Sequence, residues 1–265
     1  MGAELKLEKV ARARRSPAPG DDLGLAAAAA EDNLSDVPVP DAVDLRADWH
    51  EVGDQGHTTS CVGWAVADSV VRWHLVKAGR LPPHERLSAR HVWMAAKETD
   101  LRDEYPSSFL EEAGTSLKTG LDVVRKFGAV LDTELPWTGG LAGGTPDEFN
   151  AKAAERKVAR YYNLGDDSVP DRSVHFAGWR RWMHQHGPVA VLLQLDRHFK
   201  DPGELLDDFD ESSVVGSHAA ALFGYGPDHF LMRSSWGPGW GDGGYAKMSL
   251  AFAAAAVIES YGVVI

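Results

Sequence analysis

The hydrophobic pattern changes its period about half-way along the chain of 265 residues. In the first half, apolar residues recur at helical spacing in three stretches that are bounded by capping residues. Ser60 and Gly79 bound the first stretch, Ser88 precedes the second, and Gly128 ends the third. The first half is therefore predicted to be mainly helical, and Cys61 is placed in the first turn of its first helix.

The second half shows a different hydrophobic pattern. One more helical pattern, AGWRRWMHQHG, is followed by short apolar or alternating runs that Gly, Pro and Asp interrupt, as is typical of strands and turns. These runs are PVAVLLQL, SHAAALFGYG, HFLMRSSW and YAKMSL. A helical part followed by a strand-rich part predicts an α+β fold with two lobes, and a functional site is expected at the seam between them.

The N-terminal stretch differs from both halves. It passes from a basic segment to Pro, Gly and Ala-rich segments without apolar periodicity. We expect residues 1–40 to form a leader that is mobile or lies on the surface. Residues 41–265 would then form the folded domain, with a mainly helical lobe over 41–140 and a mainly strand-rich lobe over 141–265.

The charge balance limits the classes of partner. The net charge of −12 disfavours nucleic acid and anionic membranes, which are polyanions that reward clustered Lys and Arg. No apolar run is long enough to predict a membrane span, and no apolar segment follows the basic start as a secretory signal requires. With one cysteine and no such signal, we expect a cytoplasmic protein.

Cys61, the only cysteine, is either an inert core residue or a nucleophile. At the start of a helix, unpaired backbone N–H groups stabilise a thiolate. A nucleophilic thiol also needs a base, usually His, and a third polar group that orients the imidazole ring. Among eleven histidines, His218 opens a predicted strand in the second half, where it is well placed to face the helix.

Three segments in this order carry a resemblance to a known family. Gln55 lies six residues before Cys61 in QGHTTSC, His218 opens HAAALFGYG, and SSWGPGWGDGGY begins at Ser234. Together they resemble the papain-like cysteine peptidases, in which the catalytic His and Asn follow the Cys at a similar separation. The resemblance runs from about Val43 to the C-terminus and is closest to short bacterial members without disulfides.

The resemblance implies a papain-like two-lobed fold and chemistry through an acyl-enzyme. Cys61 would attack a carbonyl carbon, His218 would keep the thiol ionised and act as base, and Gln55 would help to stabilise the oxyanion. Ser234 stands where the family has an Asn that orients the histidine. The implied partner is a peptide or protein substrate, and no cofactor or metal is implied.

Three further residues follow from the same resemblance. Gly114 and Thr115 in AGTS correspond to a double-Gly segment that pairs with the substrate backbone, and Thr115 is expected to crowd the place of the second Gly. Trp236 is expected to lie over His218 and its orienting partner. The neighbouring pair Glu111 and Glu112 would favour a basic substrate residue, although an exposed acidic turn explains these two residues as well.

Two other functions stay open at this stage. The same acyl-enzyme, met by an amine in place of water, gives an acyl transferase or transpeptidase. The Ser at 234 also fits a papain-like fold that has lost catalysis and serves as a binding module. Other motifs support no site: His184 and His186 lack a zinc pattern, GPGWGDGG lacks the Lys of a phosphate loop, and GxSxG is absent.

Overall fold

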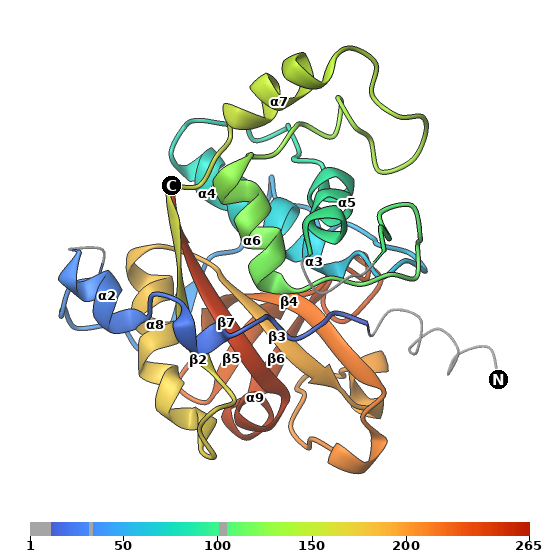
Figure 1. Ribbon diagram of the computed structural model, residues 1–265. Helices are drawn as coiled ribbons and strands as arrows, with labels where there is room; N and C mark the ends of the chain where they lie inside the picture. The colour runs from blue at the N-terminus through green and yellow to red at the C-terminus, as the bar shows by residue number, and fades with distance from the viewer. Residues whose placement is uncertain (1–11, 32–33, 101–104) are drawn as a thin grey trace.

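An antiparallel sheet forms the centre of the structure, a computed structural model that describes residues 12–31, 34–100 and 105–265 (Figure 1). Its strands follow the spatial order β2-β7-β3-β4-β5-β6, and the short β1 pairs with the end of β4. The strands are β1 (Val43–Asp44), β2 (Arg160–Asp166), β3 (Val189–Leu195), β4 (Gly216–Tyr225), β5 (His229–Arg233), β6 (Tyr245–Ser249) and β7 (Val257–Val264).

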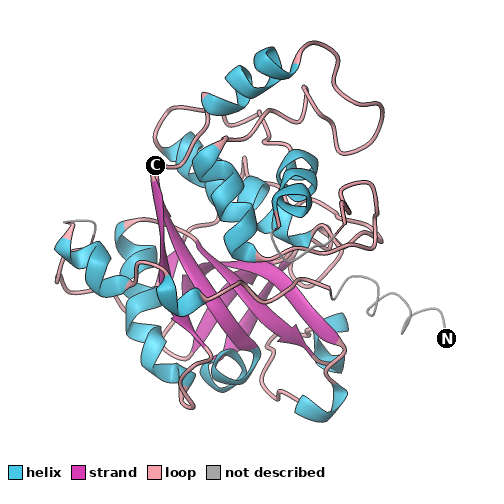
Figure 2. Ribbon diagram, viewed as in Figure 1, coloured by secondary structure: helices cyan, strands magenta, loops and turns pink. Residues whose placement is uncertain are grey.

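Helices cover both faces of this sheet (Figure 2). Three consecutive helical segments after β1 join into one continuous central helix from Cys61 to Lys77. The middle segment of this helix is π-helical. The α-helices and the π-helical segment are α2 (Leu25–Ala30), α3 (Cys61–Gly63), η2 (Trp64–Val71), α4 (Arg72–Lys77), α5 (Ala89–Thr99), α6 (Leu117–Lys126), α7 (Pro146–Ala154), α8 (Phe176–Gln185) and α9 (Leu250–Ala256). In the described part of the chain, none of the helices is long and apolar enough to cross a membrane.

Alternation along β3 explains why its apolar run is continuous. Ala190 and Leu192 pack into a core shared with the central helix, whereas Val189, Val191 and Leu193 pack into a second core with α8 and α9. A strand that is buried on both faces has no polar side, which is what the run VAVLLQL indicates. The predicted α+β class is confirmed: helices α3 to α6 form one lobe and the sheet with α8 and α9 forms the other (Figure 1).

The predicted helix boundaries fit the structure with one exception. Ser88 caps α5 by accepting the N–H of His91, and Gly79 and Gly128 take the positive φ that ends a helix. Ser60 occupies the N-cap position before Cys61, but its side chain does not cap the helix. Its hydroxyl lies 2.7 Å from the Thr58 hydroxyl, so a local side-chain contact replaces the cap.

The described part of the N-terminal stretch lies against both lobes. It begins beside α6, passes along the outer edge of β2 and reaches α2, whose Ala28 is fully buried (Figure 1). Helix α7 packs on the helical lobe through Val130 and Leu135, so that lobe extends to about residue 154. Helices α2, α7 and α9 and strands β1, β2 and β7 are not predicted by the sequence patterns.

A buried charge network joins the two lobes, between the middle of the central helix and the end of β5. Asp68 on the helix accepts from Arg233 on β5 at 2.9 Å and from Arg72 at 3.2 Å, and Arg86 also reaches it. Asp68 and Arg233 are almost wholly buried. Although burial alone would raise the pKa of Asp68, the surrounding guanidinium groups lower it to about 2.

We expect Asp68→Asn to lower the free energy of unfolding by about 3–5 kcal/mol, because it leaves buried guanidinium charge without a counter-charge. Asp36→Asn, which breaks the exposed pair of Asp36 with Arg181, is the control and should cost at most about 1 kcal/mol. Denaturant titrations measure both. The difference between Asp68→Asn and the parent should be full above pH 4 and shrink as the pH falls toward 2, since the folded-state pKa of Asp68 lies below its unfolded value. Equal effects of the two substitutions would refute the role given to the network.

Candidate active site

The seam between the lobes brings together the residues that the sequence singles out. Cys61 begins α3, His218 lies near the start of β4, and Ser234 directly follows β5. The Cys61 thiol lies within hydrogen-bonding range of the main chain of Ala219, the residue after His218. Gln55 lies in the loop before the central helix and is bound to the segment that follows Ser234.

His218 is held by one polar contact and a cover of aromatic rings. Its Nε2 atom lies 3.3 Å from the Ser234 hydroxyl, while Nδ1 has no hydrogen-bond partner among the described residues. The ring centroids of Trp236 and Phe199 lie 5.7 Å and 5.5 Å from that of the imidazole. Trp236 thus packs with its ring steeply tilted against the imidazole. Phe199 is a neighbour that the sequence analysis missed, since nothing in the segment DRHFKD marks it.

Both polar atoms of the Gln55 side-chain amide form hydrogen bonds with neighbouring residues. Its Oε1 atom accepts from the Ser235 hydroxyl at 2.6 Å, and its Nε2 atom donates to the Thr58 carbonyl at 2.8 Å. The backbone N–H of Gln55 also donates to the Ser235 carbonyl at 2.8 Å. Because a side-chain amide has two N–H groups, one stays available for a ligand. Ser235 was not singled out from sequence, although the second Ser of SSW is the signal that could have found it.

Cys61 and His218 are both fully buried, and this changes their charge state. Burial raises the pKa of the Cys61 thiol to about 11 and lowers the pKa of His218 to about 3. Burial therefore favours the neutral form of both groups in this arrangement. The ion pair implied by the resemblance is disfavoured here, because neither side chain is exposed to water that would stabilise its charge.

The segment of residues 12–16, which we call the strap, crosses the seam beside the segment that carries His218. Its Ala13 N–H donates to the Ser217 carbonyl on β4 at 3.0 Å, and its Arg14 N–H donates to the Thr115 carbonyl at 2.9 Å. Ala13 belongs to the same buried cluster as Cys61. Figure 1 shows the strap, in dark blue, between the helical lobe and the sheet.

Gly114 and Thr115 both contribute to the surface on which the strap lies. A side chain at Gly114 would place its Cβ atom 1.8 Å from the Arg12 carbonyl oxygen, so only glycine admits the strap there. The Thr115 side chain is fully buried, and its hydroxyl lies 3.5 Å from the Asp100 carboxylate. The expected crowding by Thr115 does not occur, because this side chain points into the interior and leaves its carbonyl open to an N–H donor.

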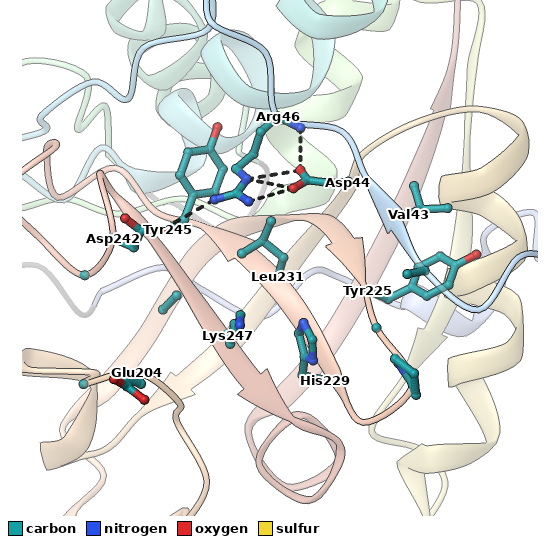
Figure 3. Close-up of a pocket in the computed structure, with 16 residues that line it drawn as sticks. Val43, Asp44, Arg46, Glu204, Tyr225, His229, Leu231, Asp242, Tyr245 and Lys247 are labelled. Atoms are coloured by element: carbon teal, nitrogen blue, oxygen red, sulfur yellow. Dashed lines mark hydrogen bonds and ion pairs between the residues drawn. The ribbon is translucent and has the colours of Figure 1, made fainter.

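A separate pocket of about 950 Å³ lies along β5 and β6 and beside the end of β4 that is remote from His218. Its lining includes His229, Tyr245 and Lys247, and on its rim Arg46 forms a two-pronged ion pair with Asp44 (Figure 3). His218 and Tyr225 lie near opposite ends of β4, a separation of about 23 Å at the usual rise of a strand. None of the candidate catalytic or substrate-binding residues predicted from the sequence lines this pocket.

Metal ligands are not grouped in the described ranges of the chain. No three His, Cys, Asp or Glu side chains there come together in a way that could hold a metal ion. His184 and His186 lie at the end of α8.

Comparisons with known proteins point in one direction. A family model described as "Papain family cysteine protease" matches residues 39–264. The cathepsin L-like proteinase of Fasciola hepatica is 26% identical over 219 residues, which are 80% of this chain and 60% of that protein. The chain thus spans about 60% of the length of this relative, and 54% of the probable cysteine protease RDL3 of Arabidopsis thaliana.

Solved structures show the same fold at low identity. Xylellain, a cysteine protease from Xylella fastidiosa, is similar with a TM-score of 0.76 and 16% identity, over 97% of this chain and 96% of that chain. The cysteine protease CMS1MS2 of Carica candamarcensis, in complex with E-64, has a TM-score of 0.60 and 22% identity, over 85% of this chain and 99% of that chain.

We expect Gly114→Ala to open the seam, because its added methyl group collides with the backbone of the strap. Alkylation of Cys61 by iodoacetamide near neutral pH should be slow in the parent and at least about tenfold faster in this variant, given the usual cost of overpacking. Gly140→Ala is the control, since nothing lies within 4 Å of its added methyl group. Parental rates in Gly114→Ala would show that the strap does not limit access to the thiol.

Proposed function

The chain belongs to the papain family of cysteine proteases, whose family model matches residues 39–264, and from that premise we propose that it is a cysteine peptidase. It hydrolyses peptide bonds through an acyl-enzyme on Cys61, with His218 as the base. The observation that carries this proposal is the environment of His218. Its Nε2 atom lies 3.3 Å from the Ser234 hydroxyl, and its Nδ1 atom has no hydrogen-bond partner among the described residues. His218 lies on β4, and the Cys61 thiol is within hydrogen-bonding range of the main chain of the next residue on that strand, Ala219.

The two ring nitrogens of His218 have different tasks in this mechanism. The hydroxyl of Ser234 fixes the ring through Nε2, so Nδ1 is the atom that takes the proton of the Cys61 thiol. The resulting thiolate lies at the first residue of α3, where the backbone N–H groups of the first turn stabilise it. This proton transfer requires the strap to leave, because water and the substrate then replace the apolar surroundings that keep both groups neutral.

The chemical steps follow from these positions. The thiolate sulfur forms a bond to the substrate carbonyl carbon, and the carbonyl electron pair moves to oxygen. The Gln55 amide and the backbone N–H of Cys61 stabilise that oxyanion. His218 then gives its proton to the leaving amine, and the acyl group remains on sulfur. Water, deprotonated by His218, releases the acyl group as a carboxylic acid and restores the thiol.

We expect a peptide epoxide of the E-64 type to add its mass once, at Cys61, in chains whose strap has been displaced by Gly114→Ala. The epoxide carbon bonds to sulfur, so Cys61→Ser should abolish the adduct and His218→Ala should slow its formation by about a hundredfold or more. Peptide mapping by mass spectrometry measures both effects. Equal labelling of the His218→Ala variant would exclude His218 as the base.

Added amines in a peptide-cleavage assay test the acyl-transfer alternative, which predicts amide products in place of carboxylic acids.

We expect Ser234→Asn to keep or raise kcat, because the Asn side chain is longer than that of Ser and its amide oxygen extends further toward the imidazole than the Ser hydroxyl does. Ser234→Ala should lower kcat by less than about tenfold, because the Trp236 and Phe199 rings still confine His218. Turnover of a peptide substrate measures both variants. A loss of several thousandfold in Ser234→Ala would mean that the hydroxyl, and not the aromatic rings, orients the base.

A further inference from the structure

The N-terminal stretch consists of two parts that are held very differently. The second part is built into the strand-rich lobe. Asn163 on β2 donates its N–H to the Leu23 carbonyl at 2.7 Å, and Glu31 accepts from the Tyr162 hydroxyl at 2.5 Å. Ala28 is fully buried and Leu34 is 7% exposed, so both side chains complete an apolar core. Removing this part would expose that core.

The strap is held by backbone hydrogen bonds and by an ion pair. Besides the N–H groups of Ala13 and Arg14, the Ser16 N–H donates to the Glu259 carboxylate at 2.7 Å. An ion pair joins Arg15 to Asp167, and the Arg15 side chain is more than half exposed. Ala13 and Ser16 are the buried residues of the strap. Opening the strap therefore uncovers little apolar surface of its own.

A strained turn separates the strap from the anchored part. Ala18 lies between Pro17 and Pro19 and has φ 44° and ψ 58°, and it is the one non-glycine residue with a positive φ in the described ranges. The left-handed region is unfavourable for an L-residue with a Cβ atom, and a residue that precedes proline is also driven toward extended conformations. Both effects favour a different conformation of Ala18, and hence a different direction of the strap.

Lys118 on α6 holds this turn in place. Its ammonium group donates to the Pro17 carbonyl at 3.2 Å and to the Ala18 carbonyl at 3.5 Å, and it pairs with Asp22 at 2.5 Å. Asp22 in turn accepts from the Tyr261 hydroxyl on β7. One cation of the helical lobe thus satisfies the carbonyls of the strained turn and connects them to the anchored part beyond it.

We propose that the strap is a reversible lid over Cys61 that turns about Ala18 and is latched by Lys118, while residues 23–31 and 34–40 stay bound to the strand-rich lobe. The lid opens without any cleavage of the chain. This inference rests on the proposed function, because it assigns the lid to the same thiol. Its test uses access and exchange, not turnover, so it can fail while the peptidase proposal stands.

The experiment compares full-length Lys118→Met with full-length Lys126→Met. Lys126 also lies on α6, but it is half exposed and pairs with the partly buried Asp122 and not with the strap. Hydrogen exchange measures the amides of residues 13–16 and of residues 27–31, and iodoacetamide measures access to Cys61. In the parent, the strap amides should exchange faster than those of α2. In Lys118→Met, strap exchange and alkylation should rise together by about tenfold, because a charge-assisted contact of the closed state is lost, while exchange in α2 stays unchanged.

A second variant guards against a general loss of folding. Arg15→Gln removes an exposed ion pair of the strap and should raise both readouts severalfold without changing the unfolding transition. If both variants showed the exchange and alkylation rates of the parent, the claim that Lys118 holds the strap closed would be wrong. Equal exchange rates in the strap and α2 would overturn the hinge, because the stretch would then open as one unit. Intact-mass spectra in which alkylated chains always lack the strap would show that opening needs cleavage.

Discussion

The buried pair of Asp68 and Arg233 is the contact on which the geometry of the seam depends. Asp68 lies two turns after Cys61 on the central helix, and Arg233 immediately precedes Ser234 at the end of β5. Fixing these two side chains on each other fixes the start of the helix relative to the end of the strand. The nucleophile and the orienting hydroxyl come from different lobes, and an apolar contact, which lacks direction, would leave their separation less well defined.

The apolar surroundings of His218 have two opposite effects. The rings of Trp236 and Phe199 limit its rotation, and they strengthen its single hydrogen bond by excluding water. The same exclusion of water makes a charged imidazole unfavourable and lowers its pKa. A base that is well oriented in the closed state is thus also inactive in it. The position of the strap decides which of the two effects prevails, because it controls entry of water and substrate.

The sequence was sufficient for those parts of the site that lie in contiguous motifs. Gln55, His218 and Ser234 each stand in a short segment with a recognisable order, and the apolar runs of β3 and β4 are long enough to be read as strands. The strap could not be predicted, because its backbone N–H contacts carry no side-chain pattern and its ion pair joins Arg15 to Asp167, far apart in the chain. Strand β7 was missed because the polar and glycine residues in VIESYGVV interrupt its apolar run, and the neutral state of Cys61 depends on burial that no local motif encodes.

The carbonyls of Ser217 and Thr115 lie on opposite sides of the seam, and both already accept an N–H from the strap. A peptide that pairs with these carbonyls meets a competitor that is part of the same chain and present at a high effective concentration. Its apparent dissociation constant is the intrinsic one divided by the fraction of molecules in which the carbonyls are vacant. Discrimination between substrates is left unchanged by this factor, since it scales the affinity for every peptide equally.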